Sequence, residues 1–444
     1  MIKYIITTIF ALVFSFNAFA NTSWDDILNA KKAPQNWLTH HGSLDGHRFS
    51  GLDDINKKNV KKLRVAWTAM IGGVEGGGIW DHAGLEGTPI VEDGFMYVTD
   101  GWGSVYKFDA TKNGKLVWKM NPDTDHDFPG AVTCCGINNR GVALIDNTVV
   151  SHTLDGRLIV TNKETGEIQQ EVQLADASVS EVITAAPLIV KNSAITGVAG
   201  AEYGIRGWLH STNLADGSKN WRTYTIPAPD EPGGDTWKQG PESHSKDAWM
   251  HGGGSTWVVG SYDPDLDVIY WGVGNPGPDW DNEYRPGDNL YSNSVLALDA
   301  DSGKIKWYFQ YTPNDPYDFD GVNEQTLVDA KIFGKKTKAV LHADRNGFAY
   351  ALDRESGKFL WGTPFVKKLD WTAGLDKYTG RPLDYDPNVD VQRYVVSSSG
   401  FRAQPEGISC PGNMGGKNWP PTAYDPDRNM YYIPVIESCA MHVN

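Results

Sequence analysis

A repeated hairpin pattern is the feature that most constrains the fold of this 444-residue chain. Each copy has alternating apolar residues, an Asp or Asn, a few polar residues, a Gly, and a Trp four residues later. The full copies are VYKFDATKNGKLVW, LHSTNLADGSKNW, VLALDADSGKIKW and AYALDRESGKFLW, and LIVTNKETGEIQQ is a degenerate copy with Gln170 in the Trp position. A period of about fifty residues with short alternating strands predicts an all-β fold, a β-propeller.

Each copy is readable as two antiparallel strands joined by a tight turn. The Gly supplies a positive φ at the turn, and the Trp is expected to fill the space between neighbouring sheets. A second repeat, at 261–272 and 423–434, has an Asp-Pro turn, and a Gly/Pro-rich insertion occupies 226–254. Helical signals are almost confined to Asp53–Leu63. An array of β-sandwiches is the weaker alternative, because its units are longer than fifty residues.

Composition excludes several classes of protein. Charged residues make up 21% of the chain and aromatic residues 11%, whereas disordered and coiled-coil proteins are rich in charge and poor in aromatics. The formal net charge is −15. A nucleic-acid binder or a protein of anionic membrane surfaces needs a basic face, so neither partner is expected.

The first twenty residues are typical of a secretory signal peptide. Lys3 supplies the positive charge, Ile5–Phe16 the apolar stretch, and Ala18-Phe19-Ala20 a cleavage site before Asn21. An uncleaved membrane anchor is the alternative, but the apolar stretch is short for a span. Export predicts a periplasmic protein without a membrane anchor, in a compartment where disulfides persist.

Two adjacent cysteines, Cys134 and Cys135, are the most unusual local feature. Their Cα atoms lie about 3.8 Å apart, closer than ordinary disulfides prefer. A bond between them would close a strained ring of the sort found at functional sites. Alternatively, each pairs with one of the distant cysteines, Cys410 and Cys439. The chemistry of the residues leaves both arrangements open.

Acidic and amide side chains at expected strand ends are candidate metal ligands. They are Glu202 in GAEYGIRG, Asn275 in GNPGPDW, and Asp318 and Asp320 in YDFDG. Carboxylate and amide oxygens suit a hard cation such as Ca²⁺ or a trivalent lanthanide. The alternative is that each acid stabilises a turn. Trp257, after the glycines of HGGGSTW, is a candidate platform for a flat ligand or else a core residue between sheets.

An ordered set of motifs identifies a family resemblance. From about residue 35 to the end, the chain resembles the quinoprotein alcohol dehydrogenases that use pyrroloquinoline quinone (PQQ), the methanol and ethanol dehydrogenase family. The resemblance implies an eight-bladed propeller with PQQ on its axis, between a vicinal disulfide and a Trp. The motifs are LEGTP, TCCGINNRG, ITAAP, GAEYGIRG, GGGSTW, GNPGPDW, RPGDN, YDFDG, ADRNGFAYALDRESGK and GKNWPP.

The resemblance also assigns positions to the cofactor. It implies a Cys134–Cys135 disulfide on one face of PQQ and Trp257 on the other, with Cys410 and Cys439 forming a second disulfide. Ala199 stands where methanol dehydrogenases carry a serine, so one polar contact is expected to be missing. The remaining positions that match PQQ contacts are Glu86, Arg140, Thr184, Gly200, Ala201, Arg345 and Asn418.

The metal ligands that the resemblance implies are Glu202, Asn275 and Asp318, and Asp318 is also the implied catalytic base. Asp320 matches the additional carboxylate of lanthanide-dependent members. Its extra negative charge favours a lanthanide(III) ion over Ca(II) by Coulomb attraction. An aspartate within reach of the alcohol hydroxyl takes its proton as hydride leaves the carbon for PQQ.

The expected activity is oxidation of small primary alcohols to aldehydes, with electrons passed to a soluble c-type cytochrome. The stretch NPGPDWDNEYRPGDNLYSNSVLALD resembles ethanol-type or broad-range members, and no C-x-x-C-H motif for covalent haem occurs in the 444 residues. A homodimer is the assembly expected. Two alternatives remain: a quinoprotein sugar or polyol dehydrogenase, many of which lack the adjacent cysteines, and a non-catalytic propeller scaffold.

We divide the chain into three regions. These are a signal peptide at 1–20, an N-terminal segment at 21–68 and a PQQ-binding propeller at 69–444. Members of the family run well past 444 residues, and a propeller must close its ring to cover the edges of its sheets. We therefore expect a propeller that is incomplete at its C-terminus, with the last blades missing.

Overall fold

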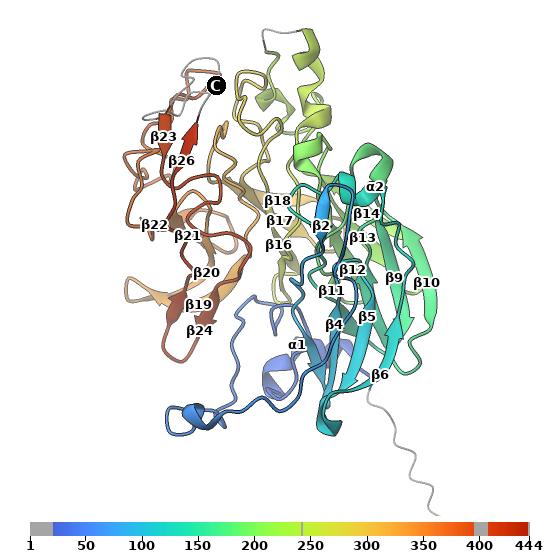
Figure 1. Ribbon diagram of the computed structural model, residues 1–444. Helices are drawn as coiled ribbons and strands as arrows, with labels where there is room; N and C mark the ends of the chain where they lie inside the picture. Colours follow the sequence, from blue (N-terminus) through green and yellow to red (C-terminus); the bar gives the residue numbers. More distant parts are fainter. Residues whose placement is uncertain (1–20, 241–242, 395–406, 443–444) are drawn as a thin grey trace, which may run out of the picture.

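The computed structural model describes residues 21–240, 243–394 and 407–442, so the predicted signal peptide lies outside the described residues. Among these residues, five four-stranded antiparallel sheets follow one another along the chain and are arranged around a common centre (Figure 1). This confirms the propeller prediction. The sheets are β3–β6 (Ile90–Glu92, Phe95–Thr99, Val105–Asp109, Lys115–Met120), β7–β10 (Ala143–Ile145, Thr148–His152, Arg157–Asn162, Ile168–Gln173), β11–β14 (Leu188–Val190, Ser193–Gly197, Trp208–Asn213, Lys219–Tyr224), β15–β18 (Ser261–Asp263, Val268–Val273, Ser294–Asp299, Ile305–Gln310) and β19–β22 (Thr326–Ile332, Lys335–Ala343, Phe348–Asp353, Phe359–Pro364).

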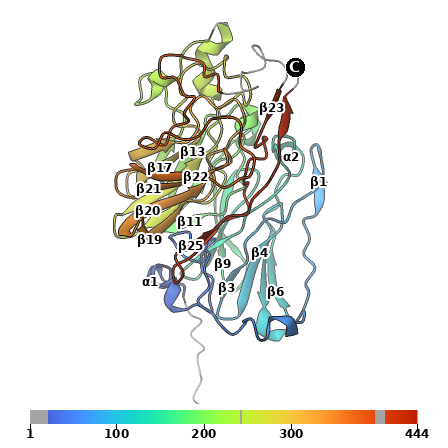
Figure 2. The same cartoon turned by 90° about the vertical axis from the view of Figure 1, so that its left-hand side faces the viewer.

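Three two-stranded sheets complete the described strands. β24 (Ala423–Asp425) and β25 (Met430–Tyr432) form the hairpin predicted from the second Asp-Pro repeat. β23 (Gly407–Ser409) pairs with β26 (Ala440–His442) at one end of the molecule (Figure 2). The third sheet, β1 (Glu75–Gly77) with β2 (Trp80–His82), precedes the first blade.

Helices are few and short, as the sequence predicts. The α-helices are α1 (Trp24–Leu28) and α2 (Phe128–Ala131), and the 3-10 segments are Ala30–Lys32, Val60–Lys62, Ala110–Lys112, Ala177–Val179, Ala201–Tyr203, Gly234–Thr236 and Ser243–His251. The expected helix at 53–63 is wrong, because only its last turn is helical. Asn59 Oδ1 accepts from the Asn56 amide and Asn56 Oδ1 from the Lys58 amide, so side chains there compete with a helical ladder.

The repeated Gly and Trp meet between neighbouring sheets. Every copy of the first repeat, the one with the recurring Gly position, is a hairpin formed by the last two strands of a four-stranded sheet. The Trp118 ring packs against Gly166 of the next sheet, and the Trp221 ring packs against Gly303. Trp221 Nε1 also donates to the Ala300 carbonyl at 3.0 Å. The pattern therefore encodes both the turn and the contact between blades.

Replacing Gly303 by Ala tests this contact. Gly303 has φ +68°, and a Cβ atom there would lie 2.5 Å from the Trp221 ring. The backbone strain costs about 1 kcal/mol and the overpacking roughly 2 kcal/mol more of the free energy of unfolding. Gly334→Ala is the matched control, because Gly334 has φ +80° and open space around it. Equal denaturation midpoints for the two variants would contradict the role of the contact.

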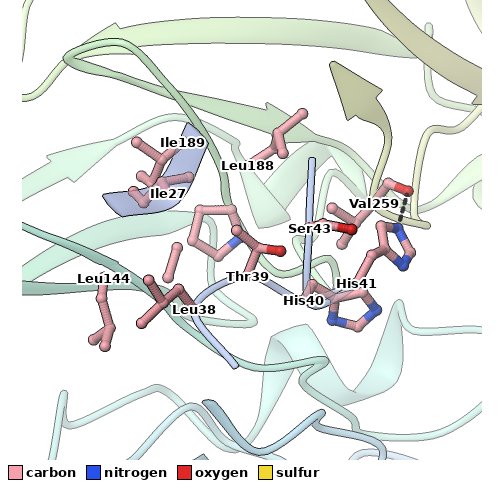
Figure 3. Close-up of a pocket in the computed structure, with 12 residues that line it drawn as sticks. Ile27, Leu38, Thr39, His40, His41, Ser43, Leu144, Leu188, Ile189 and Val259 are labelled. Atoms are coloured by element: carbon pink, nitrogen blue, oxygen red, sulfur yellow. Dashed lines mark hydrogen bonds between the residues drawn. The ribbon is translucent and has the colours of Figure 1, made fainter. Parts of the chain in front are cut away.

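The N-terminal segment crosses one end of the sheets before the first blade begins. Its backbone joins the first strand of each of four sheets through the hydrogen-bonded pairs Trp37–Val91, Leu44–Tyr262, Asp45–Leu327 and His47–Tyr424. His40 and His41, on this segment, line a cavity of about 10 Å³ (Figure 3). His41 Nε2 lies 3.1 Å from the Val259 carbonyl oxygen. Burial lowers the pKa of His41 to about 4, so the neutral ring donates this bond.

Candidate cofactor and metal site

A second cavity, of about 220 Å³, collects nearly all the residues predicted for the cofactor and the metal. Ala201 and Asn275 are the exceptions: Ala201 lies between two lining residues, and Asn275 contacts the lining residue Asp320. The predicted residues that line the cavity are Glu86, Cys134, Cys135, Arg140, Thr184, Gly200, Glu202, Trp257, Asp318, Asp320, Arg345 and Asn418.

The cysteine pairing that the residues left open is settled by the structure. Cys134 is bonded to Cys135, and Cys410 to Cys439. The vicinal disulfide lines the cavity, with Cys134 half-buried and Cys135 exposed. It therefore presents a compact apolar surface to whatever occupies the cavity.

Arg140 connects two sides of the cavity. Its guanidinium lies 4.6 Å from the centroid of the Trp257 ring, and Nη2 pairs with Glu86 Oε2 at 2.7 Å. The side chain is buried, and Nε has no hydrogen-bond partner. A buried cation with an unused donor above an indole is suited to an anionic planar ligand.

Asp320 is the most connected acid of the site. It is 2% exposed and accepts three hydrogen bonds: from the backbone N–H of Asn275 at 2.8 Å, from Trp257 Nε1 at 3.1 Å and from Arg345 Nη1 at 2.8 Å. These bonds fix the carboxylate against the indole. They also join the predicted metal ligands to the predicted cofactor platform.

Asp318 lies beside the same guanidinium. Arg345 Nη1 is 3.4 Å from Asp318 Oδ1 and 3.3 Å from its carbonyl oxygen. Asp318 has a φ of +64°, which is uncommon for a residue with a side chain. This backbone conformation turns its carboxylate toward the cavity that it lines. Burial raises the pKa of Asp318 well above its usual value; Arg345 opposes this rise, and Asp320 adds to it.

Two further carboxylates add negative charge. The pKa of Glu202 is raised to about 7, mainly by burial and further by the charges of Asp279 and Asp320. Burial raises the pKa of Asp279 to about 6, with Arg285 opposing and Asp320 reinforcing the shift. Carboxylates that repel one another in this way favour a bound cation.

The donor set fits a metal ion. Asn275 is fully buried, and its Oδ1 has no hydrogen-bond partner. An unused amide oxygen beside several carboxylates is the chemistry that a hard cation requires. Within the described part of the chain, no three His, Cys, Asp or Glu side chains already stand in a metal-binding arrangement.

The cavity also contains residues that the sequence did not single out. Ser255 and Trp419 sit inside the quoted motifs GGGSTW and GKNWPP, so their position beside Trp257 and Asn418 was the available signal. Asp279, in the motif GNPGPDW, lies outside the cavity lining but accepts a hydrogen bond from Asn275 Nδ2 at 2.8 Å. Thr133, Asn138, Val182 and Met414 also line the cavity, as does Ala199, which was already singled out from the sequence.

This combination of propeller and site is that of a quinoprotein. The chain matches the family model for PQQ enzymes described as the glucose/ethanol/alcohol dehydrogenase β-propeller domain, over residues 37–366. It belongs to the family of PQQ-dependent alcohol dehydrogenases.

Relatives within the family include lanthanide enzymes. The chain is 39% identical over 441 residues to the quinoprotein alcohol dehydrogenase PedH of Pseudomonas putida, covering 96% of this chain and 70% of that protein. It is 36% identical over 430 residues to a lanthanide-dependent methanol dehydrogenase of Methylacidiphilum fumariolicum, covering 94% of this chain and 67% of that protein.

Solved structures agree with the fold. The quinohemoprotein alcohol dehydrogenase ADHIIG of Pseudomonas putida HK5 superposes with a TM-score of 0.82 at 34% identity, covering 94% of this chain and 59% of that one. A europium-containing methanol dehydrogenase has a TM-score of 0.80 at 34% identity, covering 93% of this chain and 70% of that one. The chain thus spans 59–70% of the length of these relatives.

Proposed function

We propose that the chain oxidises small primary alcohols to aldehydes with PQQ and one metal ion, a lanthanide(III) in preference to Ca(II). The observation that carries the proposal is the convergence, in one cavity, of the vicinal disulfide, two indoles, two buried guanidiniums and four carboxylates. The lanthanide-dependent relatives support the preference for a trivalent ion.

Each side chain has a task in this proposal. Arg140 and Arg345, whose Nε atoms lack partners, would hold the carboxylates of PQQ, and Trp257 and the disulfide would bound its ring faces. Glu202, Asn275, Asp318 and Asp320 would hold the metal ion. When bound, PQQ accepts two electrons from the alcohol, and the metal ion polarises it for that role.

Asp318 is the proposed base. Its carboxylate faces the cavity and takes the hydroxyl proton of the alcohol at Oδ. Arg345 donates to Asp318 and Asp320 at once and so fixes their separation. A cation held by the same acids lowers the pKa of Asp318 and keeps its carboxylate ionised.

Location and partners follow from the same proposal. The N-terminal twenty residues have the signal-peptide pattern, which supports export to the periplasm, where a soluble c-type cytochrome would accept the electrons. No helix among the described residues is long and apolar enough to cross a bilayer. A homodimer remains the assembly that we propose.

The test is uptake of PQQ, recorded as a change in quinone absorbance on adding PQQ with La³⁺ or Ca²⁺. We expect saturable binding that Trp257→Ala weakens at least about tenfold, because the ring face is lost. Trp361→Ala is the matched control, since Trp361 is 37% exposed on β22 and lies outside the cavity lining. Absence of PQQ uptake with either ion would rule out the proposed enzyme.

A further inference from the structure

We propose that Asp279 is a positioning residue for the metal ion, because it turns the amide of Asn275 so that Oδ1 faces the cation. The inference rests on the proposed function, and it adds to that function a residue which is not itself a ligand. Asp279 is half-buried, three residues past Pro276 in the loop that follows β16.

The orientation of the Asn275 amide follows from its hydrogen bonds. Nδ2 donates to Asp279 Oδ1 at 2.8 Å and lies 3.4 Å from the Pro276 carbonyl oxygen. A carboxylate only accepts hydrogen bonds, so the NH₂ side of the amide must face Asp279. The oxygen is therefore directed away from Asp279, and it is buried without a partner.

The unused oxygen is the observation that points to a ligand. Burying a carbonyl oxygen without a hydrogen-bond partner is costly, so such atoms are rare unless something binds them. The Asn275 backbone amide donates to Asp320 Oδ1 at 2.8 Å, which places this residue among the proposed ligands. The opposite amide orientation would direct two N–H donors toward a cation and would repel it.

A buried arginine holds the backbone at Asp279. Arg285 Nε donates to the Pro278 carbonyl at 3.0 Å, and Nη2 donates to the Asp279 carbonyl at 3.1 Å. Arg285 is fully buried, and its Nη1 donates to Asn289 Oδ1 at 2.9 Å. The peptide groups before and after the Asp279 Cα atom are thus both fixed by Arg285, which holds the Asp279 carboxylate beside Asn275.

Whether Asp279 orients the Asn275 amide or attracts the ion through its charge can be told apart by two variants. Asp279→Ala removes the acceptor and frees the amide to rotate. Asp279→Asn removes the charge but keeps an oxygen that accepts from Nδ2. A positioning residue is therefore rescued by Asn, whereas a residue that binds the ion through its charge is not. Partners that orient metal ligands typically contribute 10–100-fold to affinity.

The experiment is calorimetric titration of LaCl₃ into the full chain loaded with PQQ, for the wild type, Asp279→Ala, Asp279→Asn and Glu283→Gln. Glu283 lies in the same loop and pairs with Arg393, so Glu283→Gln is the charge-matched control. We expect Asp279→Ala to raise the dissociation constant of La³⁺ about 30-fold, and Asp279→Asn and the control to stay within about threefold of the wild type.

Each other outcome overturns the inference in a distinguishable way. Equal losses in Asp279→Ala and Asp279→Asn would show that the charge of Asp279, rather than the amide orientation, holds the ion. Wild-type affinity in Asp279→Ala would show that Asn275 needs no support. Absence of La³⁺ binding by the PQQ-loaded wild type would overturn the proposed metal site itself, and with it this inference. Near-ultraviolet circular dichroism of the three variants checks that each one folds.

Discussion

Asp318→Asn is expected to lower kcat for a primary alcohol about a thousandfold, the loss typical of removing a general base. Asn has the same shape as Asp but accepts no proton from the alcohol. It still offers Oδ1 to Arg345 Nη1, which lies 3.4 Å from that atom in the wild type, so the cavity keeps its shape. The measurement is kcat at saturating alcohol, in chains loaded with PQQ and La³⁺.

PQQ uptake by Asp318→Asn separates a loss of turnover from a loss of the cofactor. We expect the quinone absorbance to show full occupancy, because Arg140, Arg345 and Trp257 are unchanged. Asp216→Asn is the control: Asp216 caps an exposed hairpin turn through its bond to Ser218. If Asp318→Asn retained more than a tenth of the wild-type kcat, another group would have to be the base.

The fold was predictable because its determinants are local. The repeated Gly has a left-handed φ at each turn, and the Trp four residues later packs on the Gly of the next sheet, as Trp221 does on Gly303. Both requirements fall within fourteen residues of sequence. The crossing of the N-terminal segment was not predictable, because Leu44 bonds to Tyr262 through backbone groups that leave no trace in side-chain pattern.

The site was predictable only in part, for a related reason. Its residues lie between 86 and 419 in the sequence, so periodicity alone says nothing of their convergence. The order of the family motifs supplied that information for Glu202, Asp318 and Asp320. Asp279 was missed because an Asp after Pro is typical of turns, and only the 2.8 Å bond to Asn275 distinguishes it.

In the proposed site, Asp320 joins the metal ligands to the cofactor platform, and its replacement is expected to have the second large effect. Asp320→Ala leaves the Asn275 amide, Trp257 Nε1 and Arg345 Nη1 without their shared acceptor. It also removes a negative charge that attracts the metal ion. Because Coulomb attraction scales with the charge of the ion, the loss for La³⁺ is half as large again in energy as the loss for Ca²⁺.

We therefore expect Asp320→Ala to reduce La³⁺-supported activity at least about a hundredfold and Ca²⁺-supported activity roughly twentyfold, following the three-to-two ratio of the ionic charges. Asp320→Asn is the matched variant, since it keeps an oxygen for the Asn275 amide and for Trp257 Nε1 but carries no charge. It should lose the preference for La³⁺ while retaining PQQ uptake. Equal losses with the two ions in both variants would mean that Asp320 supports the indole and the guanidinium but does not select the metal.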